Sequence, residues 1–193
     1  MPASQPTEPR SADTLPHSTA KTGRVKHGLV LEGGGMRGMF NCGILDVMLE
    51  HGLRVDGAVG VSAGAAFGVN YKSRQIGRAL RYNCQYGADP RYMGLRSLLT
   101  TGNLVNADFA YRTVPLELDK FDEATFEADP MEFHLVCTDV DRGMPVYHQL
   151  TQFNERALDW IRASASMPIV STAVEIDGLR LLDGGIVDSI PLR

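Results

Sequence analysis

Two neighbouring segments of the sequence each show the pattern of a strand, a turn and a helix. In the first, apolar residues 29–31 precede glycines 33–35, and apolar residues then recur at helical spacing up to Gly52. In the second, residues 55–61 precede a sharp turn and a helix of small residues over 63–70. Because parallel strands need a crossover connection, two such units in succession predict an α/β fold with helices on both faces of the sheet.

The rest of the chain gives weaker patterns. The middle, 72–131, has no dominant periodicity, and the acidic stretch 117–132 reads as solvated. Residues 133–140 then predict a buried strand and residues 154–165 a helix. Residues 174–182 predict a hairpin that turns at an Asp-Gly pair.

Length and charge exclude some classes of protein. The 193 residues carry 19 Lys and Arg against 23 Asp and Glu, a net charge of −4, which disfavours a nucleic-acid-binding protein. Residues 1–26 contain four prolines and no apolar block, so we expect a disordered leader there and one domain over 27–193. The longest uncharged stretch, 57–71, is rich in glycine and shorter than the about 20 apolar residues of a membrane-spanning helix.

Cysteine and histidine spacing gives no sign of a metal site. The three cysteines are odd in number and lack the C-x-x-C spacing of zinc or thioredoxin chemistry, which favours a reduced, cytoplasmic compartment. The five histidines form no H-x-x-x-H pair. We therefore expect neither a metal nor a cofactor.

The strongest local motif is GVSAG at residues 60–64, a G-x-S-x-G between a predicted strand and a predicted helix. A strained turn there would present the Ser62 hydroxyl at the end of the sheet. The positive end of the following helix would face this hydroxyl, where negative charge develops during acyl transfer. A small-residue turn needed only for packing is the alternative, but the context favours Ser62 as a nucleophile.

A second motif, GGGMRG at residues 33–38, also lies between a strand and a helix. Consecutive glycines let several backbone N–H groups point into one concavity, which suits either a phosphate or an oxyanion. The spacing also matches G-x-G-x-x-G, with Asp56 18 residues after Gly38, so a nucleotide-binding domain is an alternative. However, Asp56 precedes its strand, whereas the glycine loop and Ser62 would share the carboxyl edge of the sheet. This placement favours acyl transfer.

A nucleophilic serine needs a base, and no histidine follows His148. The last 45 residues supply carboxylates instead. Asp183 stands at the end of the predicted strand 179–182 and precedes Gly184 and Gly185, which permit close approach. A plain turn at the end of a strand is the alternative reading of Asp183.

Four motifs together resemble a known family. GGGMRG at 33–38, GVSAG at 60–64, ASASMP at 163–168 and DGG at 183–185 are similar to the successive blocks of the patatin-like phospholipases. The resemblance runs from about Leu29 to the end of the chain. Each block is weak alone, but their order and spacing are highly specific.

This resemblance implies a three-layer α/β/α sandwich with a mainly parallel central sheet, and hydrolysis of acyl esters of lipids without a metal. Ser62 would be the nucleophile and Asp183 the base that activates it directly. The N–H groups of Gly34 and Gly35, with Arg37 nearby, would form the oxyanion hole. The other glycines of the motifs would support these turns: Gly33, Gly38, Gly60, Gly64, Gly184 and Gly185.

The resemblance also sets expectations for context. Residues 163–168 would support the Ser-Asp dyad without a chemical role. Domains of this family usually continue well past the aspartate block, whereas this chain stops ten residues after Asp183, so we expect a domain that is incomplete at its C-terminus. The expected partner is a lipid or another hydrophobic acyl ester, with transient, peripheral contact to a membrane surface and no nucleic acid.

Two other functions stay open from sequence. One is a nucleotide-binding domain that uses the loop 33–38, and the other is a catalytically silent lipid-binding module. Arg74, Arg78 and Arg81 could share one helix face and meet anionic headgroups, although a solvated face paired with carboxylates is favoured.

Overall fold

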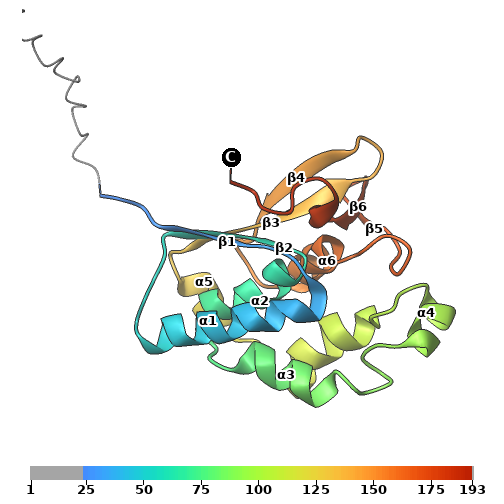
Figure 1. Ribbon diagram of the computed structural model, residues 1–193, viewed down its shortest axis with the longest axis horizontal. Helices are drawn as coiled ribbons and strands as arrows, with labels where there is room; N and C mark the ends of the chain where they lie inside the picture. The colour runs from blue at the N-terminus through green and yellow to red at the C-terminus, as the bar shows by residue number, and fades with distance from the viewer. Residues whose placement is uncertain (1–23, 193) are drawn as a thin grey trace, which may run out of the picture.

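The computed structural model describes residues 24–192. Most of the expected leader, residues 1–23, lies outside this part of the chain. Six strands form one mixed sheet in the order β1-β2-β3-β6-β5, and β4 pairs with β3 off this path (Figure 1). The strands are β1 (Gly28–Leu31), β2 (Gly57–Val61), β3 (Glu132–Asp139), β4 (Met144–Gln149), β5 (Val174–Ile176) and β6 (Leu179–Asp183).

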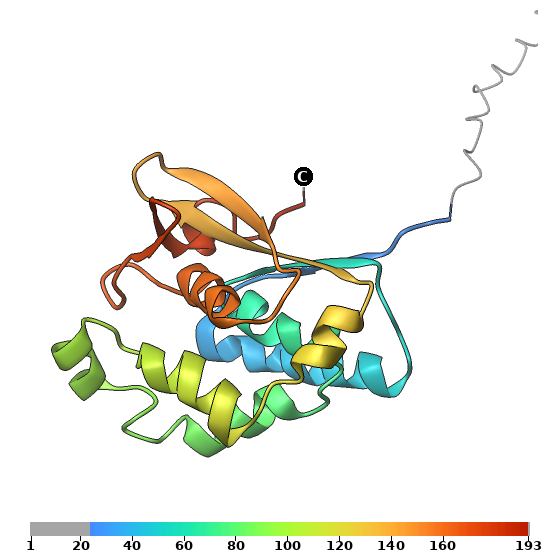
Figure 2. The same cartoon turned by 180° about the vertical axis from the view of Figure 1, so that it is seen from behind.

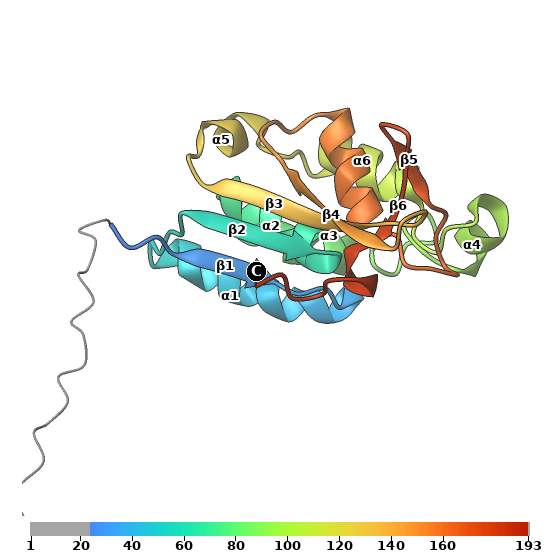
Figure 3. The same cartoon turned by 90° about the horizontal axis from the view of Figure 1, so that it is seen from above.

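Strand direction divides the sheet into two parts. β1, β2 and β3 run parallel, as the two strand-turn-helix units predict, and lie side by side in the view from above (Figure 3). β4 and β6 both run antiparallel to β3, and β5 pairs antiparallel with β6. The expected hairpin is the β5-β6 pair, in which Asp177 and Gly178 both have positive φ, as a two-residue turn of this kind requires. The α/β class is therefore confirmed, and its sheet is mixed.

Helical segments occupy both sides of the sheet. α2 and α6 pack against the side of β3 that carries Leu135 and Cys137, and Figure 2 shows this helical layer from behind. The short η3 packs on the opposite side, where a Cβ built on Gly184 would lie 3.0 Å from Val136 Cβ. The helices are η1 (Gly35–Gly38), α1 (Met39–Glu50), α2 (Ala63–Lys72), α3 (Arg78–Tyr86), α4 (Leu95–Thr101), the π-helix η2 (Phe109–Leu118), α5 (Glu123–Ala128), α6 (Glu155–Ser164) and η3 (Gly184–Ile186).

α2 is the helix most enclosed by the rest of the protein. All but one of its residues are buried, and its small side chains allow it to lie against β1 and β2. One apolar cluster fills the space between the sheet, α2, α5 and α6. A second cluster joins α2 to α1, α3 and η2. The start of α2, where Ser62 lies, is thus held between two cores.

The structure corrects the expectation that the acidic stretch 117–132 is solvated. The stretch 117–132 is not simply solvated, because Phe121, Phe126 and Met131 are buried in the main core and Asp129 is buried as well. Asp122 caps α5 by accepting a hydrogen bond from the Thr125 amide at 2.9 Å, which explains where this helix begins.

The three arginines do not share one helix face. Arg74 precedes α3 and pairs with Asp129 at 2.9 Å, whereas Arg81 forms two hydrogen bonds of 2.8 Å with the Asp119 carboxylate. Arg78 is buried, and its Nε donates a hydrogen bond to the backbone carbonyl of Asp119. All three side chains are paired with carboxylates, as the favoured alternative predicts, but Arg78 is buried and not solvated.

Candidate active site

The register of the sheet brings the ends of β2 and β6 together. Val61, the last residue of β2, pairs with Val136 of β3, and the next residue of β3, Cys137, pairs with Asp183 on its other side. Ser62 and Asp183 therefore flank the same point of β3, about two strand spacings apart, or roughly 9.5 Å. Two side chains that lean toward each other can close this separation.

The side chains of Ser62 and Asp183 meet. Ser62 Oγ donates a hydrogen bond of 2.6 Å to Asp183 Oδ2, and both residues are buried, with exposed fractions of 7% and 5%. Ser62 has φ 55° and ψ −123°, a conformation that non-glycine residues rarely adopt. The backbone strain at the turn between β2 and α2 turns the hydroxyl toward Asp183 and the cavity beside it.

Burial controls the proton affinity of Asp183. Loss of solvent raises the pKa of its carboxyl above the usual 3.8, against the opposing effect of hydrogen bonds from Ser62 and from the Gly185 amide. The Gly185 amide bonds to Oδ1 at 2.8 Å, which leaves Oδ2 for Ser62. Thr138 Oγ1 donates to the Asp183 carbonyl at 2.7 Å. The carboxylate is thus fixed in position and is a stronger base than an exposed aspartate.

The segment 163–168 lies directly behind the pair. Ser164 Oγ accepts a hydrogen bond from the Ser62 amide at 3.0 Å and donates one to the Val136 carbonyl at 2.7 Å. The Asp183 amide donates to the Ser166 carbonyl at 2.8 Å. This segment therefore ties the two turns to each other and to β3. It also occupies the Ser62 amide, which is then unavailable to stabilise an oxyanion.

The glycine loop lies against the serine. A Cβ on Gly33 would be 2.7 Å from Ser62 Cβ, so only glycine allows this approach. Gly35 has φ 55° and lines the same cavity as Ser62. The Gly34 amide has no acceptor in the part of the chain that the structure describes. The exposed Arg37 side chain lies over Gly34, with Nε 3.8 Å from the Cβ that another residue would have there.

Other glycines of the motifs mark close backbone contacts. A Cβ on Gly60 would be 2.6 Å from the Ala65 backbone, and one on Gly184 would be 2.3 Å from the Val136 carbonyl oxygen. A Cβ on Gly38 would lie 3.0 Å from Ala63 Cβ. In contrast, a Cβ on Gly185 would meet only the Asp183 carboxylate, at 3.1 Å. These positions explain why the turns around the pair are built from glycine.

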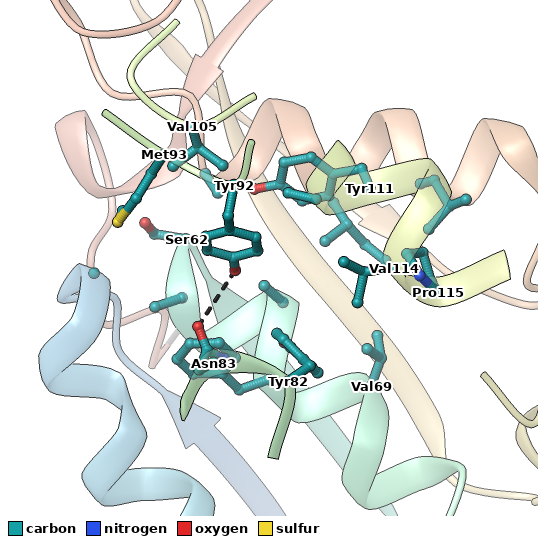
Figure 4. A pocket seen from close by; sticks show the side chains of 18 of the residues that line it. Ser62, Val69, Tyr82, Asn83, Tyr92, Met93, Val105, Tyr111, Val114 and Pro115 are labelled. Atoms are coloured by element: carbon teal, nitrogen blue, oxygen red, sulfur yellow. Dashed lines mark hydrogen bonds between the residues drawn. The ribbon is translucent and has the colours of Figure 1, made fainter. Parts of the chain in front are cut away.

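A cavity of about 300 Å³ opens beside Ser62 (Figure 4). It follows α2 from Ser62 past Ala66 to Val69, seven residues further on, which is about 10 Å of helix. Its walls are mostly apolar or aromatic. Figure 4 labels several of these wall residues: Tyr82, Tyr92, Met93, Val105, Tyr111, Val114 and Pro115.

A few polar groups interrupt the apolar wall. The Tyr92 hydroxyl donates to Asn83 Oδ1 at 3.3 Å. Figure 4 shows the Tyr92 ring on the same side of the cavity as Ser62. The Tyr111 hydroxyl points toward the end of the cavity that holds Ser62. Burial raises the pKa of both phenols, that of Tyr92 to about 12, so they are neutral donors at physiological pH. No sequence pattern pointed to these tyrosines, because they come from the middle segment without clear periodicity.

The described histidines lie away from the pair. His148 stacks on Trp160 with ring centroids 3.9 Å apart, and His134 is nearest to Glu132. Among residues 24–192, no histidine bonds to Ser62 or Asp183. Asp56, the acid of the alternative nucleotide site, accepts a hydrogen bond from the His27 amide at 2.9 Å at the opposite end of β2.

The fold and the site define an α/β protein with a buried serine-aspartate pair at the end of an apolar cavity. The chain belongs to the patatin-like phospholipase family, because the family model for patatin-like phospholipases matches residues 29–193. The resemblance that the four motifs predict is thereby confirmed.

Two curated relatives and one solved structure are similar to this chain. The chain is 31% identical over 171 residues to the uncharacterized protein YjjU of Escherichia coli, covering 86% of this chain and 47% of that one. It is 27% identical to lysophospholipase nte1 of Aspergillus fumigatus, covering 84% of this chain and 10% of the relative. The crystal structure of VipD from Legionella pneumophila shares the fold, with a TM-score of 0.50 and 15% identity over 87% of this chain and 47% of VipD. The chain thus spans less than half the length of these proteins.

No helix within the described residues is both long enough and apolar enough to cross a membrane. The three cysteines are free thiols, and Cys42 and Cys137 are buried. The cytoplasmic location stays a prediction.

Proposed function

We propose that this chain hydrolyses acyl esters of lipids, with Ser62 as the nucleophile and Asp183 as its base. The observation that carries the proposal is the 2.6 Å hydrogen bond between the two side chains at the end of an apolar cavity. Membership of a family of phospholipases supports a lipid substrate, as does the similarity to lysophospholipase nte1. A cavity of about 300 Å³ is at the lower end of the about 300–1,000 Å³ typical of small-molecule sites, which fits a single acyl chain.

The reaction would proceed through an acyl-enzyme. Asp183 Oδ2 takes the proton from Ser62 Oγ as the oxygen attacks the ester carbonyl. The amides of Gly34 and Gly35 stabilise the resulting oxyanion, and Arg37 supports the loop from outside. The alcohol then leaves with the proton from Asp183, and the acyl chain stays on Ser62.

Water completes the cycle. Asp183 removes a proton from a water molecule, which attacks the acyl-Ser62 ester and releases the fatty acid, with the proton returned to Ser62. A carboxylate is normally too weak a base for a serine. Two features of the site compensate, since burial raises the pKa of Asp183 and the short hydrogen bond aligns the transfer.

Labelling with a fluorophosphonate tests the nucleophile. The probe should modify Ser62, identified by peptide mass spectrometry, and the label should be absent in the Ser62→Ala variant. Hydrolysis of a lysophospholipid and of p-nitrophenyl esters should fall by about 10⁴-fold or more in this variant. Unchanged turnover without Ser62 would rule out this nucleophile, whereas saturable dinucleotide binding with no labelling would support the nucleotide-binding alternative.

A further inference from the structure

A group of large apolar side chains is exposed near the mouth of the Ser62 cavity. Leu95 and Leu99 stand on the same face of α4, with exposed fractions of 68% and 78%. Ile169, in the segment between α6 and β5, is 97% exposed, and Met167 beside it is 44% exposed. We call Leu95, Leu99, Met167 and Ile169 the rim.

The rim is one surface, although it comes from two distant parts of the chain. In Figures 1, 2 and 3, α4 and the segment between α6 and β5 lie next to each other at one end of the molecule. The Leu104 amide donates to the Val170 carbonyl at 2.7 Å, and the Thr172 amide donates to Asn103 Oδ1 at 2.9 Å. These bonds fix the rim residues relative to one another.

The rim is continuous with the cavity. Met167 lines the cavity together with Leu104 and Ser62, and it is also partly exposed to solvent. A chain that enters from the rim side therefore meets apolar groups along its way to the serine. This continuity links the exposed surface to the site where we propose hydrolysis.

The backbone of Ile169 supports a role for this exposed side chain. Its φ is 72°, a conformation that is a genuine outlier for a β-branched residue. Glycine would adopt this conformation without strain and without exposing apolar surface to water. Strain of this kind is retained most often at functional positions.

The charges around the rim suit an anionic surface. No acidic residue occurs between Asp89 and Asp108, and residues 163–174 carry no charge. Arg91 is paired with Asp89, whereas the exposed Arg96 on α4 has no acidic partner among the described residues. A single basic residue near an anionic bilayer contributes about 1 kcal/mol of attraction, so Arg96 beside this apolar edge favours an anionic over a neutral surface.

We propose that the rim docks on the surface of an anionic lipid bilayer, with Leu95, Leu99 and Ile169 inserted among the acyl chains. Arg96 lies at the level of the headgroups. This inference rests on the proposed function, because docking would let an acyl chain pass from the bilayer into the Ser62 cavity without crossing water. The rim then selects lipid in membranes over dispersed esters.

Sedimentation with vesicles tests docking without hydrolysis. The full chain with Ser62→Ala should bind phosphatidylcholine vesicles that contain phosphatidylglycerol, and more weakly those of phosphatidylcholine alone. Ile169→Gly and the double variant Leu95→Ser/Leu99→Ser should each weaken binding by about tenfold or more. Arg96→Gln should remove the preference for phosphatidylglycerol. Val47→Ser, at a site on α1 that is 52% exposed, is the matched control and should bind as the parent does.

Two results would overturn the docking surface: binding by the rim variants at the parental level, or an equal loss in Val47→Ser. Ile169→Gly relieves strain, so its thermal stability should not fall, and weaker binding cannot then be attributed to unfolding.

A second readout separates docking from catalysis. With Ser62 intact, the rim variants should keep their turnover of the soluble ester p-nitrophenyl butyrate and lose turnover of vesicle lipid. Loss of both activities would make the rim part of the cavity wall and overturn the proposal. If the parent hydrolyses neither substrate, the proposed function fails, while the vesicle experiment still decides docking.

Discussion

Gly64, in the first turn of α2, lies directly against the Leu31 carbonyl of β1: a Cβ on Gly64 would be 2.1 Å from that oxygen. Gly64→Ala should therefore separate α2 from β1 and lower the free energy of unfolding by more than about 3 kcal/mol. Denaturant unfolding measures this change. Gly43→Ala is the control, because a Cβ at Gly43 on α1 meets nothing within 4 Å and should stabilise the helix by about 0.5–1 kcal/mol. Similar losses in both variants would contradict the close contact.

Replacing Asp183, the proposed base, should separate activity from stability. Asp183→Asn keeps the size of the side chain but cannot accept the Ser62 proton, so ester hydrolysis should fall by about 10³-fold or more. The same variant should have a higher Tm than the parent at pH 7, because it removes a charge from a buried site.

This gain in stability should depend on pH. The folded chain holds the Asp183 proton more tightly than the unfolded chain does, so the free energy of unfolding falls as the pH rises from the usual carboxyl pKa of 3.8 through the raised folded pKa. Asparagine carries no such penalty. Thermal melts of both proteins should therefore converge below pH 3.8 and diverge above it. A parent that is more stable than Asp183→Asn at neutral pH would contradict the raised pKa.

The pH profile of hydrolysis should report the same group. The proposed mechanism needs Asp183 in its ionised form, so kcat/KM should fall with decreasing pH through a pKa higher than the ordinary 3.8. His134→Gln and His148→Gln should leave this acid limb unchanged, since neither histidine bonds to the pair. A limb that disappears in either variant would indicate a histidine base.

Ser164 is expected to position the nucleophile. Ser164→Ala leaves the buried Ser62 amide without an acceptor, so stability should fall by about 1–3 kcal/mol and kcat should decrease while KM changes little. Ser166→Ala is the matched control, because the Ser166 hydroxyl bonds only to the Arg162 carbonyl at the end of α6 among the residues that the structure describes. Equal effects on kcat in the two variants would argue against a positioning role for Ser164.

The far part of the cavity should set the acyl length. Val69 lines it two turns of α2 away from Ser62, so Val69→Phe should fill this end. We expect turnover of p-nitrophenyl butyrate to be retained within about threefold and turnover of the dodecanoate to fall by about tenfold or more. The measurement is the turnover of both esters by the parent and the variant. An equal loss of turnover for the two esters would show that the acyl chain does not occupy the end of the cavity at Val69.

Local sequence was sufficient for the parallel part of the sheet. The strands at β1, β2 and β3 and the helices α1, α2 and α6 follow from apolar runs, glycine turns and helical spacing, because each of these signals lies within one short segment of sequence. The turns that carry Ser62 and Asp183 are visible for the same reason, as each follows a strand. What local pattern cannot provide is the pairing of β6 antiparallel to β3, which sets the distance between the two side chains.

The residues of the cavity wall could not be predicted from the sequence. Its residues come from α3, the segment around Tyr92 and η2, which are short and acquire their order from contacts with α2. In the stretch 117–132, single apolar residues such as Phe126 are separated by acidic ones, so composition hides a buried role. Ile169 has a positive φ, and an isoleucine in the sequence does not predict this backbone conformation.

The serine-aspartate pair and the cavity wall are carried by different parts of the chain. Strands and their tight turns hold Ser62 and Asp183, whereas much of the surrounding wall belongs to residues 78–121, outside the sheet. We expect substitutions in residues 78–121 to alter which molecules fit the cavity while the geometry of Ser62 and Asp183 is preserved. A fold divided in this way can acquire different substrates during evolution while the residues at the ends of its strands stay the same.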